Sequence, residues 1–379
     1  AAAGDAVIAG LAQLDLVARR FEIANLPNAA RPALGNVSLE ACSAALVAFD
    51  KQTPERRTAI LDRTGVPDAY SPWKRALGLY PLTSIPFRWG VSRWEAATQE
   101  AFAQPSAALA KLWSPPPATA SLLERHAPVF EIDTRTTDDR FGMPQWTADG
   151  IAIDTIAPVV FTHVAHTRFA GDSLVQLTYL LWFPARPRSG FVDLLSGTLD
   201  GLVFRITLDR DGEVMVADSI HACGCYHLFF PSSRLTARPA PDAHQEWAFS
   251  PATLPALSLG QRLRVRVAAG THYVTGLFAA PQDTAGAQAY TLRPLDELRS
   301  LPLPGGRERR SLYGPDGLVD GSERGERFLF WPMGIASPGA MRQWGHHATA
   351  FVGRRHFDEP DLLERRFARV AGPATAKVQ

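Results

Sequence analysis

The chain has 379 residues, a length that suits two or three domains. With 46% hydrophobic and 20% charged residues it can bury substantial cores, and we expect a globular protein. The formal net charge is +1 and no cluster of lysine and arginine indicates nucleic-acid binding, so we expect no nucleic-acid partner. No apolar run reaches the roughly 18 residues of a membrane span, so we expect no transmembrane segment.

The first five residues, Ala1 to Asp5, resemble the end that remains when a signal peptide is cleaved after small residues. Abundant arginine, alanine and proline with little lysine is typical of a high-GC bacterial genome. We therefore expect a bacterial protein that is periplasmic or secreted. Three cysteines are too few for a disulfide scaffold and leave one unpaired.

Apolar residues recur at helical spacing through the first third of the chain, which predicts a mostly helical region over 1–113. Helices are expected over 7–22 and over 38–50. Thr53-Pro54-Glu55 is typical of the start of a third, because proline suits the first helical position. Cys42 lies on the apolar side of the second helix, where we expect a small buried hydrophobic residue.

The end of this helical region contains an arginine- and tryptophan-rich stretch over 88–94, which could bind a ligand or pack onto the next domain. Ser92 and Glu95 have the spacing of a capping box, which predicts that a helix begins there. Pro105 should kink that helix. The run Trp113-Ser-Pro-Pro-Pro117 predicts the boundary of the region.

The pattern changes to alternating apolar and polar residues after residue 118, which predicts an antiparallel β domain over 118–285. Three hairpins are expected, joining 159–169 to 174–183, 202–208 to 213–219, and 262–267 to 271–278. Gly212 falls at a turn position that needs a positive φ. Consecutive hairpins form a meander, so we expect a β-sandwich or an open barrel.

The last part of the chain, 286–379, is expected to be loop-rich and helical and to pack on the β domain. A short helix is predicted over 291–298 and a charged helix near 358–369. Together with the helical N-terminal region, these elements predict an α+β fold.

The densest chemical pattern in the chain is the alternation of His221, Cys223, Cys225 and His227. In an extended strand these side chains would share one face. Imidazole and thiolate are the ligands that zinc and copper prefer, so the pattern predicts a transition-metal site, zinc more than copper. The outer pair would lie roughly 20 Å apart on a straight strand. We therefore expect a turn or bulge at Gly224, with two or three of the four side chains as ligands.

Additional metal ligands are expected from the histidines elsewhere in the chain. His163 and His166 are three residues apart, so a regular strand would place them on opposite faces and only one would join the site. Their positions alone do not decide which one. His346, His347 and His356 are a weaker source.

Other interpretations of the two central cysteines remain open. Their spacing matches neither zinc fingers, which have Cys-x2-4-Cys, nor the haem-attachment pattern Cys-x-x-Cys-His. A disulfide between Cys223 and Cys225 would close a very small ring and be easily reduced, which would suit a redox role. A third interpretation is that both cysteines are buried free thiols among structural histidines.

A metal-dependent hydrolase would also need a carboxylate to handle the proton of the attacking water. Asp218 and Asp172 are the candidates, although aspartate at such positions is commonly a turn or cap residue. Arg168 could hold a carboxylate or an oxyanion, or form a salt bridge. The chain has no His-Glu-x-x-His, Gly-x-Ser-x-Gly or Gly-x-Gly-x-x-Gly motif.

The sequence therefore predicts an exported bacterial metal-dependent enzyme, hydrolytic rather than oxidative, acting on a small molecule or peptide. The alternative is an exported binding or assembly protein in which Cys223 and Cys225 form a disulfide or a structural metal clip. Nine tryptophans are spread over the chain and are compatible with ligand binding, although Trp182 is expected in the core.

Overall fold

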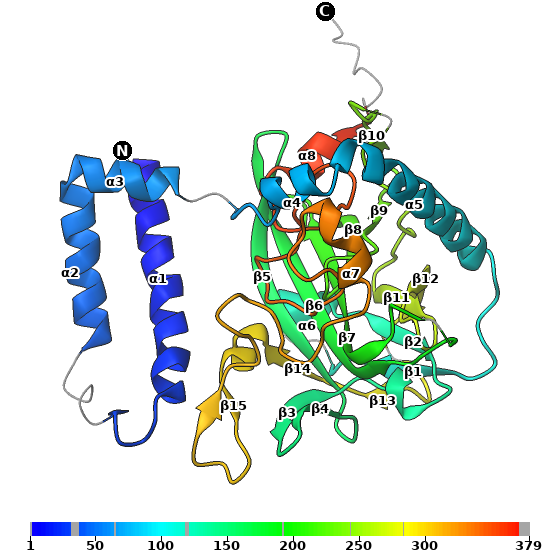
Figure 1. The fold of residues 1–379 in the computed structure, drawn as a ribbon, viewed down its shortest axis with the longest axis horizontal. Coiled ribbons are helices and arrows are strands. Elements are labelled where there is room, and N and C mark those ends of the chain that lie inside the picture. The colour runs from blue at the N-terminus through cyan, green and yellow to red at the C-terminus, as the bar shows by residue number, and fades with distance from the viewer. Residues whose placement is uncertain are drawn as a thin grey trace, which may run out of the picture. The chain divides into compact units, whose positions relative to one another are not determined.

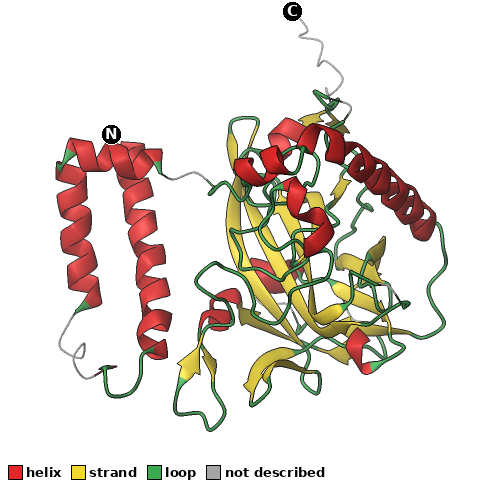
Figure 2. Ribbon diagram, viewed as in Figure 1, coloured by secondary structure: helices red, strands yellow, loops and turns green. Residues whose placement is uncertain are grey.

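The computed structural model describes residues 2–31, 38–63, 66–117, 121–191, 193–242, 244–282 and 284–370. Helices and sheets both contribute, so the α+β prediction is confirmed (Figure 2). Contacts divide the chain into two compact units: one consists of Ala1–Pro67, Pro144–Ala152 and Asp296–Asp316, and the other of the remaining residues. None of the described helices has the length and apolar character needed to cross a membrane.

The first unit is built on three helices, α1 (Ala2–Asn25), α2 (Leu39–Gln52) and α3 (Pro54–Asp62) (Figure 1). Pro54 opens α3 as predicted. Ser38 caps α2 by accepting a hydrogen bond from the backbone N–H of Ala41. The expectation that Cys42 is buried is wrong: α2 packs against α1 and α3 in a shallow layer, and none of its side chains is buried. This unit also contains the short strands β15 (Leu301–Pro302) and β16 (Arg309–Arg310) and most of the hairpin of β3 (Met143–Thr147) and β4 (Gly150–Asp154).

The second unit begins with two helices, α4 (Pro72–Leu77) and α5 (Tyr80–Phe102). The capping box predicted at Ser92 is wrong, because α5 begins twelve positions earlier, where Pro81 occupies its first turn. Ser92 lies inside the helix and its hydroxyl donates to the carbonyl of Arg88. The helix ends before Pro105, so the predicted kink there is also wrong.

Two sheets form the body of this unit. The larger has the order β14-β5-β6-β7-β8-β9. Its strands are β14 (Thr291–Pro294), β5 (Val159–Phe169), β6 (Asp172–Arg186), β7 (Gly197–Leu208), β8 (Val214–His221) and β9 (Leu228–Pro231). Two of the predicted hairpins, β5–β6 and β7–β8, are confirmed, and Gly212 has the expected positive φ of 80°.

The smaller sheet has the order β12-β11-β2-β1-β13 and includes the third predicted hairpin. Its strands are β12 (Val274–Pro281), β11 (Gln261–Val267), β2 (Val129–Asp133), β1 (Ala110–Ser114) and β13 (Gln288–Ala289). Three strand pairs, β5–β14, β2–β11 and β1–β13, are parallel, since long crossovers rather than tight turns connect them. The sheets are therefore mixed, and they form no closed barrel.

The two sheets bury a common apolar core. Phe204 of the larger sheet and Phe130 and Val265 of the smaller one belong to it, and all three are fully buried. Trp182 is fully buried, as predicted. The face of the larger sheet that points into this core is called the inner face below, and the opposite one the outer face.

The C-terminal part of the chain covers the outer face. The helix α8 (Leu362–Arg366) and the strand β17 (Phe367–Arg369), which pairs with β10 (Leu235–Ala237), pack against Phe229 and Met215. The helix predicted near 358–369 is thus shorter than expected. The helix predicted over 291–298 is replaced by β14 and a 3-10 turn, because these residues pair with the edge of the larger sheet.

Candidate active site

The segment that carries the central histidines and cysteines is a turn rather than one extended strand. β8 ends at His221 and β9 begins at Leu228, so the predicted shared strand face is wrong beyond His221. The predicted turn at Gly224 is present: its φ is 88° and its N–H donates to the carbonyl of His221. The chain must reverse here because β9 pairs antiparallel with β8. A Cβ at Gly224 would lie 2.4 Å from the carbonyl oxygen of Ala348, so the position also needs glycine for space.

Gly224→Ala should therefore lower the free energy of unfolding by about 2–4 kcal/mol, because it adds a steric overlap to the cost of a left-handed conformation. Chemical denaturation measures this. Gly212→Ala is the matched control: its φ is 80°, but no atom lies within 4 Å of the added Cβ. The control should lose only about 1 kcal/mol. Equal losses in the two variants would contradict the close approach to Ala348.

The turn sends the two histidines to opposite faces of the sheet. His227 lies on the outer face, where its Nε2 donates to Asp218 Oδ2 at 2.9 Å. Asp218 also receives two bonds from the Arg205 guanidinium, at 3.0 and 2.7 Å. All three side chains are buried. Asp218, predicted as a catalytic carboxylate, is therefore held in a structural ion pair.

The ionisation of this group follows from its contacts. Burial opposes the charge on Asp218, but Arg205 and His227 outweigh it, and the pKa of Asp218 is lowered. Burial lowers the pKa of His227 to about 3, so its imidazole is neutral.

On the inner face, His221 ends a buried row of alternating carboxylates and imidazoles. His221 Nδ1 lies 3.4 Å from Asp200 Oδ1, and His272 Nδ1 lies 2.8 Å from Asp200 Oδ2. The Nε2 of His272 faces Asp139 Oδ1 at 3.7 Å. Arg324 approaches Asp200 at 3.3 Å. The four members Asp139, His272, Asp200 and His221 are called the relay below.

The relay has a defined charge pattern. Burial acts against the charge of Asp200, but His221, His272 and Arg324 hold the pKa of Asp200 well below its ordinary value. Burial also opposes the charge of His272, yet the nearby carboxylates of Asp139 and Asp200 raise the pKa of His272. Burial lowers the pKa of His221, so this imidazole is neutral. Its Nε2 is buried without a hydrogen-bond partner in the described structure.

The histidines expected from β5 do not meet near this relay. His163 pairs with Thr178, which pairs with Arg205, so His163 shares the outer face with Asp218 and lies 5.4 Å from the ring of Trp344. His166 is exposed.

Arg168 and Asp172 lie near the β5–β6 turn. The Arg168 side chain is exposed, and Asp172 forms an ion pair with Arg210 at the surface. Neither residue lines the cavity described below.

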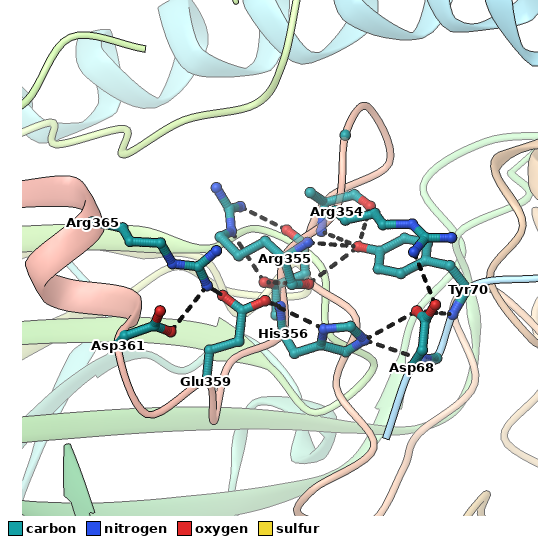
Figure 3. Close-up of polar contacts among 12 residues, drawn as sticks. Asp68, Tyr70, Arg354, Arg355, His356, Glu359, Asp361 and Arg365 are labelled. Carbon is teal, nitrogen blue, oxygen red and sulfur yellow. Dashed lines mark hydrogen bonds and ion pairs between the residues drawn. The ribbon is translucent and has the colours of Figure 1, made fainter. Parts of the chain in front are cut away.

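The C-terminal histidines have separate environments. His347 is buried, and burial lowers its pKa to about 3. His356 accepts a hydrogen bond from the N–H of Ala69 through Nε2, and its Nδ1 lies 3.4 Å from Glu359 (Figure 3). His346 packs against Gly317.

The described residues contain no group of three or more histidine, cysteine, aspartate or glutamate side chains placed to hold one metal ion. Cys223 and Cys225 are free, buried thiols. The zinc site and the Cys223–Cys225 disulfide therefore stay predictions.

A cavity of about 540 Å³ opens beside this turn, under the inner side of α5. Its apolar lining includes Phe87, Val91, Phe249, Leu329, Phe330 and Phe351. Its polar lining includes Cys225, Tyr226, Tyr273, Glu246, Glu326 and Arg355. The volume suits a small molecule, and the lining suits a ligand with an apolar body and a polar group at one end.

Glu326 is the most perturbed carboxyl in the wall of the cavity. It precedes α7 (Arg327–Phe330) and is only 4% exposed. Burial raises the pKa of Glu326 to about 7, and the charges of Arg324 and Arg186 offset only part of that effect. A Cβ at Gly339 would overlap Glu326 Oε1, so the glycine leaves room for the carboxyl in this position. Near neutral pH, Glu326 can both donate and accept a proton.

Two tyrosines, Tyr226 and Tyr273, also line the cavity, and an arginine contacts one of them. Tyr226 has a φ of 62°, a conformation that is strained for a bulky residue and is found at functional sites. Its ring lies 4.5 Å from Tyr273 and 5.2 Å from His221. Arg186 donates to the Tyr273 hydroxyl at 3.0 Å. Burial raises the pKa of both tyrosines, so their hydroxyls stay protonated and can donate hydrogen bonds.

Phe351 and Arg355 of the cavity lining belong to a loop, residues 348–359, that Tyr70 holds in place. The Tyr70 hydroxyl donates to the carbonyl of Ala350 at 2.7 Å and accepts from the N–H of Arg355 at 3.2 Å (Figure 3). Burial raises the pKa of Tyr70 to about 12, so the hydroxyl keeps its proton. Glu246 holds the same loop by accepting two backbone N–H groups. These bonds position Arg355 at the cavity.

Tyr70→Phe should lower the free energy of unfolding by about 1–3 kcal/mol, because it leaves buried backbone groups of Ala350 and Arg355 without a partner. Thermal and denaturant unfolding measure the loss. Tyr80→Phe is the control, since the half-buried Tyr80 hydroxyl accepts one bond, from Gly353. We expect less than about 1 kcal/mol for the control. A loss for Tyr70→Phe no larger than that of the control would contradict the anchoring role.

The sequence patterns missed most of the polar wall. Glu326, Arg186 and His272 belong to no recognisable motif. Arg186 ends β6, and His272 lies in the turn between β11 and β12. Tyr226 lies between Cys225 and His227 of the predicted metal site, and this position is the one sequence feature that could have identified it.

The cavity places a proton-transfer group, hydroxyl donors and an apolar surface within one enclosed space. It can hold an apolar ligand, exclude water from it and exchange a proton at its polar group. Comparisons with protein-family models, with curated proteins and with solved structures found no match to this chain, so the geometry of the site carries its functional interpretation.

Proposed function

We propose that this chain is an acid–base enzyme that binds a small, largely apolar ligand in the cavity under α5 and transfers a proton at its polar group through Glu326. The observation that carries the proposal is a buried carboxyl with a pKa of about 7 in the wall of a cavity of about 540 Å³. Strongly shifted carboxyls in clefts are typical of catalytic acids and bases.

The neighbouring groups suit this chemistry. The protonated hydroxyls of Tyr226 and Tyr273 can stabilise negative charge that develops on the ligand. Arg186 donates to Tyr273 and orients it. His221 is a positioning residue in this proposal, since Asp200 holds its imidazole against the ring of Tyr226.

The hydrolytic class stays a proposal drawn from the sequence. Glu326 fits it, because a general base that takes the proton of an attacking water works best with a pKa near the working pH. A zinc ion on His221, Cys223, Cys225 or His227 also stays a proposal, as does export to the bacterial envelope. Elemental analysis of chelator-free protein tests the metal, and fractionation of the native host tests the location.

The second candidate is a binding protein that uses the same cavity without turnover. The aromatic lining from Phe87, Phe249 and Phe351 favours it, because rigid aromatic walls hold apolar ligands. Glu326→Gln separates the two proposals. An enzyme should keep its ligand affinity and lose turnover, whereas a binding protein has no turnover to lose.

Binding of an environment-sensitive naphthylsulfonate dye tests the cavity directly. We expect one site per chain, and Val91→Trp, which fills the cavity from α5, should weaken binding by about tenfold or more. Val164→Trp, a substitution at an exposed position of β5, should leave binding unchanged. Equal binding by the wild type and Val91→Trp would place the dye elsewhere and remove the support for this cavity as the ligand site.

A further inference from the structure

We propose that the outer surface of the helices beside this cavity docks on an anionic lipid bilayer. The surface is formed by α4, α5 and α7, which pack together through the 3-10 turn Trp331–Met333 and lie side by side in Figure 1. It is called the docking surface below. The proposal goes beyond the proposed function and does not depend on Glu326.

The docking surface is rich in exposed apolar side chains. On α5, Leu82, Ile85 and Trp89 follow one helical stripe and are each more than 60% exposed. On α7, Phe328 and Leu329 are more than half exposed. Apolar residues gathered on the outer face of packed helices mark an interaction site, because a monomer rarely leaves such a patch in water.

The charges of the same elements favour anionic lipid over other occupants. Residues 71–94, which span α4 and the first part of α5, contain four lysines and arginines and no aspartate or glutamate. The acidic residues of α5, Glu95 and Glu100, lie in its last two turns, where Glu95 pairs with Arg88 at 3.5 Å. Lys74 lies over the exposed ring of Trp73 at 5.8 Å, and Arg93 lies over Trp89 at 4.8 Å. Tryptophan next to a cationic side chain suits the lipid headgroup region, where the ring is half-buried and the cation meets phosphate.

Arg327 repeats this arrangement on the second helix, 4.9 Å from the ring of Phe328. The stretch 327–334 also lacks acidic residues. An exposed ring beside a cation therefore occurs on both helices, which is expected if both contact the same anionic membrane surface.

The docking surface is continuous with the cavity. The outer stripe of α5 carries Ile85 and Trp89, while Phe87 and Val91 on its inner side line the cavity. Leu329 is exposed and also lines the cavity. Apolar ligands concentrate in bilayers, so a docking surface in contact with lipid would let them pass from the bilayer into the cavity without crossing water.

Flotation of the full chain with vesicles tests the proposal. We expect binding to phosphatidylcholine vesicles that contain phosphatidylglycerol, much weaker binding to phosphatidylcholine alone, and a loss with added salt. The triple variant Leu82→Ser, Ile85→Ser, Trp89→Ser should bind the anionic vesicles about tenfold or more weakly. Lys74→Gln and Arg93→Gln should each weaken binding by about fivefold.

The matched control replaces three other exposed apolar residues of the same unit, Ile156→Ser, Phe191→Ser and Leu259→Ser. It should bind like the wild type. The proposal would be overturned if the control lost as much binding as the α5 variant, or if binding did not depend on anionic lipid. A wild-type chain that ignores vesicles and self-associates through α5, as shown by sedimentation, would also overturn it, because a second copy would then cover the surface. Failure of this test leaves the titration of Glu326, and hence the proposed function, untouched.

Discussion

Asp218→Ala is expected to lower the free energy of unfolding by about 3–5 kcal/mol. The substitution removes both hydrogen bonds to Arg205 and the bond to His227, and it leaves the Arg205 charge buried with one remaining bond, to the carbonyl of Phe357. The midpoint and slope of a urea unfolding curve measure the loss.

Asp172→Ala is the matched control, since both aspartates were sequence candidates for catalysis. Asp172 pairs with Arg210, which is 73% exposed, and an exposed pair contributes at most about 1 kcal/mol. A loss at Asp218 no larger than the loss at Asp172 would contradict a buried ion pair.

The Asp218 pair should also make the fold sensitive to acid. The pKa of Asp218 is lowered in the folded state, so its contribution is present above the unfolded pKa of about 3.9 and is lost as the pH falls through the folded pKa. Stability measured from neutral pH downward should therefore fall less steeply in Asp218→Ala than in the wild type.

Glu326→Gln is expected to have the opposite effect on stability. The folded pKa of Glu326 is raised to about 7, so between the unfolded pKa and pH 7 the folded state binds more protons than the unfolded state. Wild-type stability therefore falls as the pH rises through this window. At pH 8, Glu326→Gln should be more stable than the wild type by up to about 4 kcal/mol, since each pKa unit corresponds to about 1.4 kcal/mol.

At acid pH, where the Glu326 carboxyl is protonated in both states, the difference should vanish. Glu323→Gln, at an exposed position three residues earlier, removes the same charge and should show no such window. The same Glu326→Gln variant should abolish turnover if the proposed acid–base chemistry holds. A stability difference that does not change with pH would contradict a carboxyl with a raised pKa.

Most of the sheet structure could be predicted because local sequence patterns determine strands and turns. Arg262 to Val267 alternate because one side of β11 packs in the core while Arg264 and Arg266 point away from it. Gly212 predicts its turn because only glycine adopts a positive φ at little cost in free energy. The start of α5 was misplaced because Ser92 and Glu95 match a cap motif that also occurs inside helices.

The candidate site could not be predicted in the same way, because it depends on contacts between distant segments. His272 contacts Asp200, which is 72 residues away in the sequence, and no local pattern predicts that contact. The alternation of His221 and His227 suggested one shared face, but the left-handed turn at Gly224 sends them to different carboxylates on opposite faces. The sequence located the turn that borders the cavity but not the carboxylates that its two histidines contact.

The pKa of Glu326 is the quantity on which the proposed chemistry depends most directly. It can be measured by an NMR titration of the full chain with isotope-labelled glutamate side chains, using Glu326→Gln to assign the resonance. A midpoint near pH 7 is the expected result. A midpoint near the ordinary glutamate value of about 4.3 would contradict the account, because Glu326 would then be fully ionised at neutral pH and unable to donate a proton.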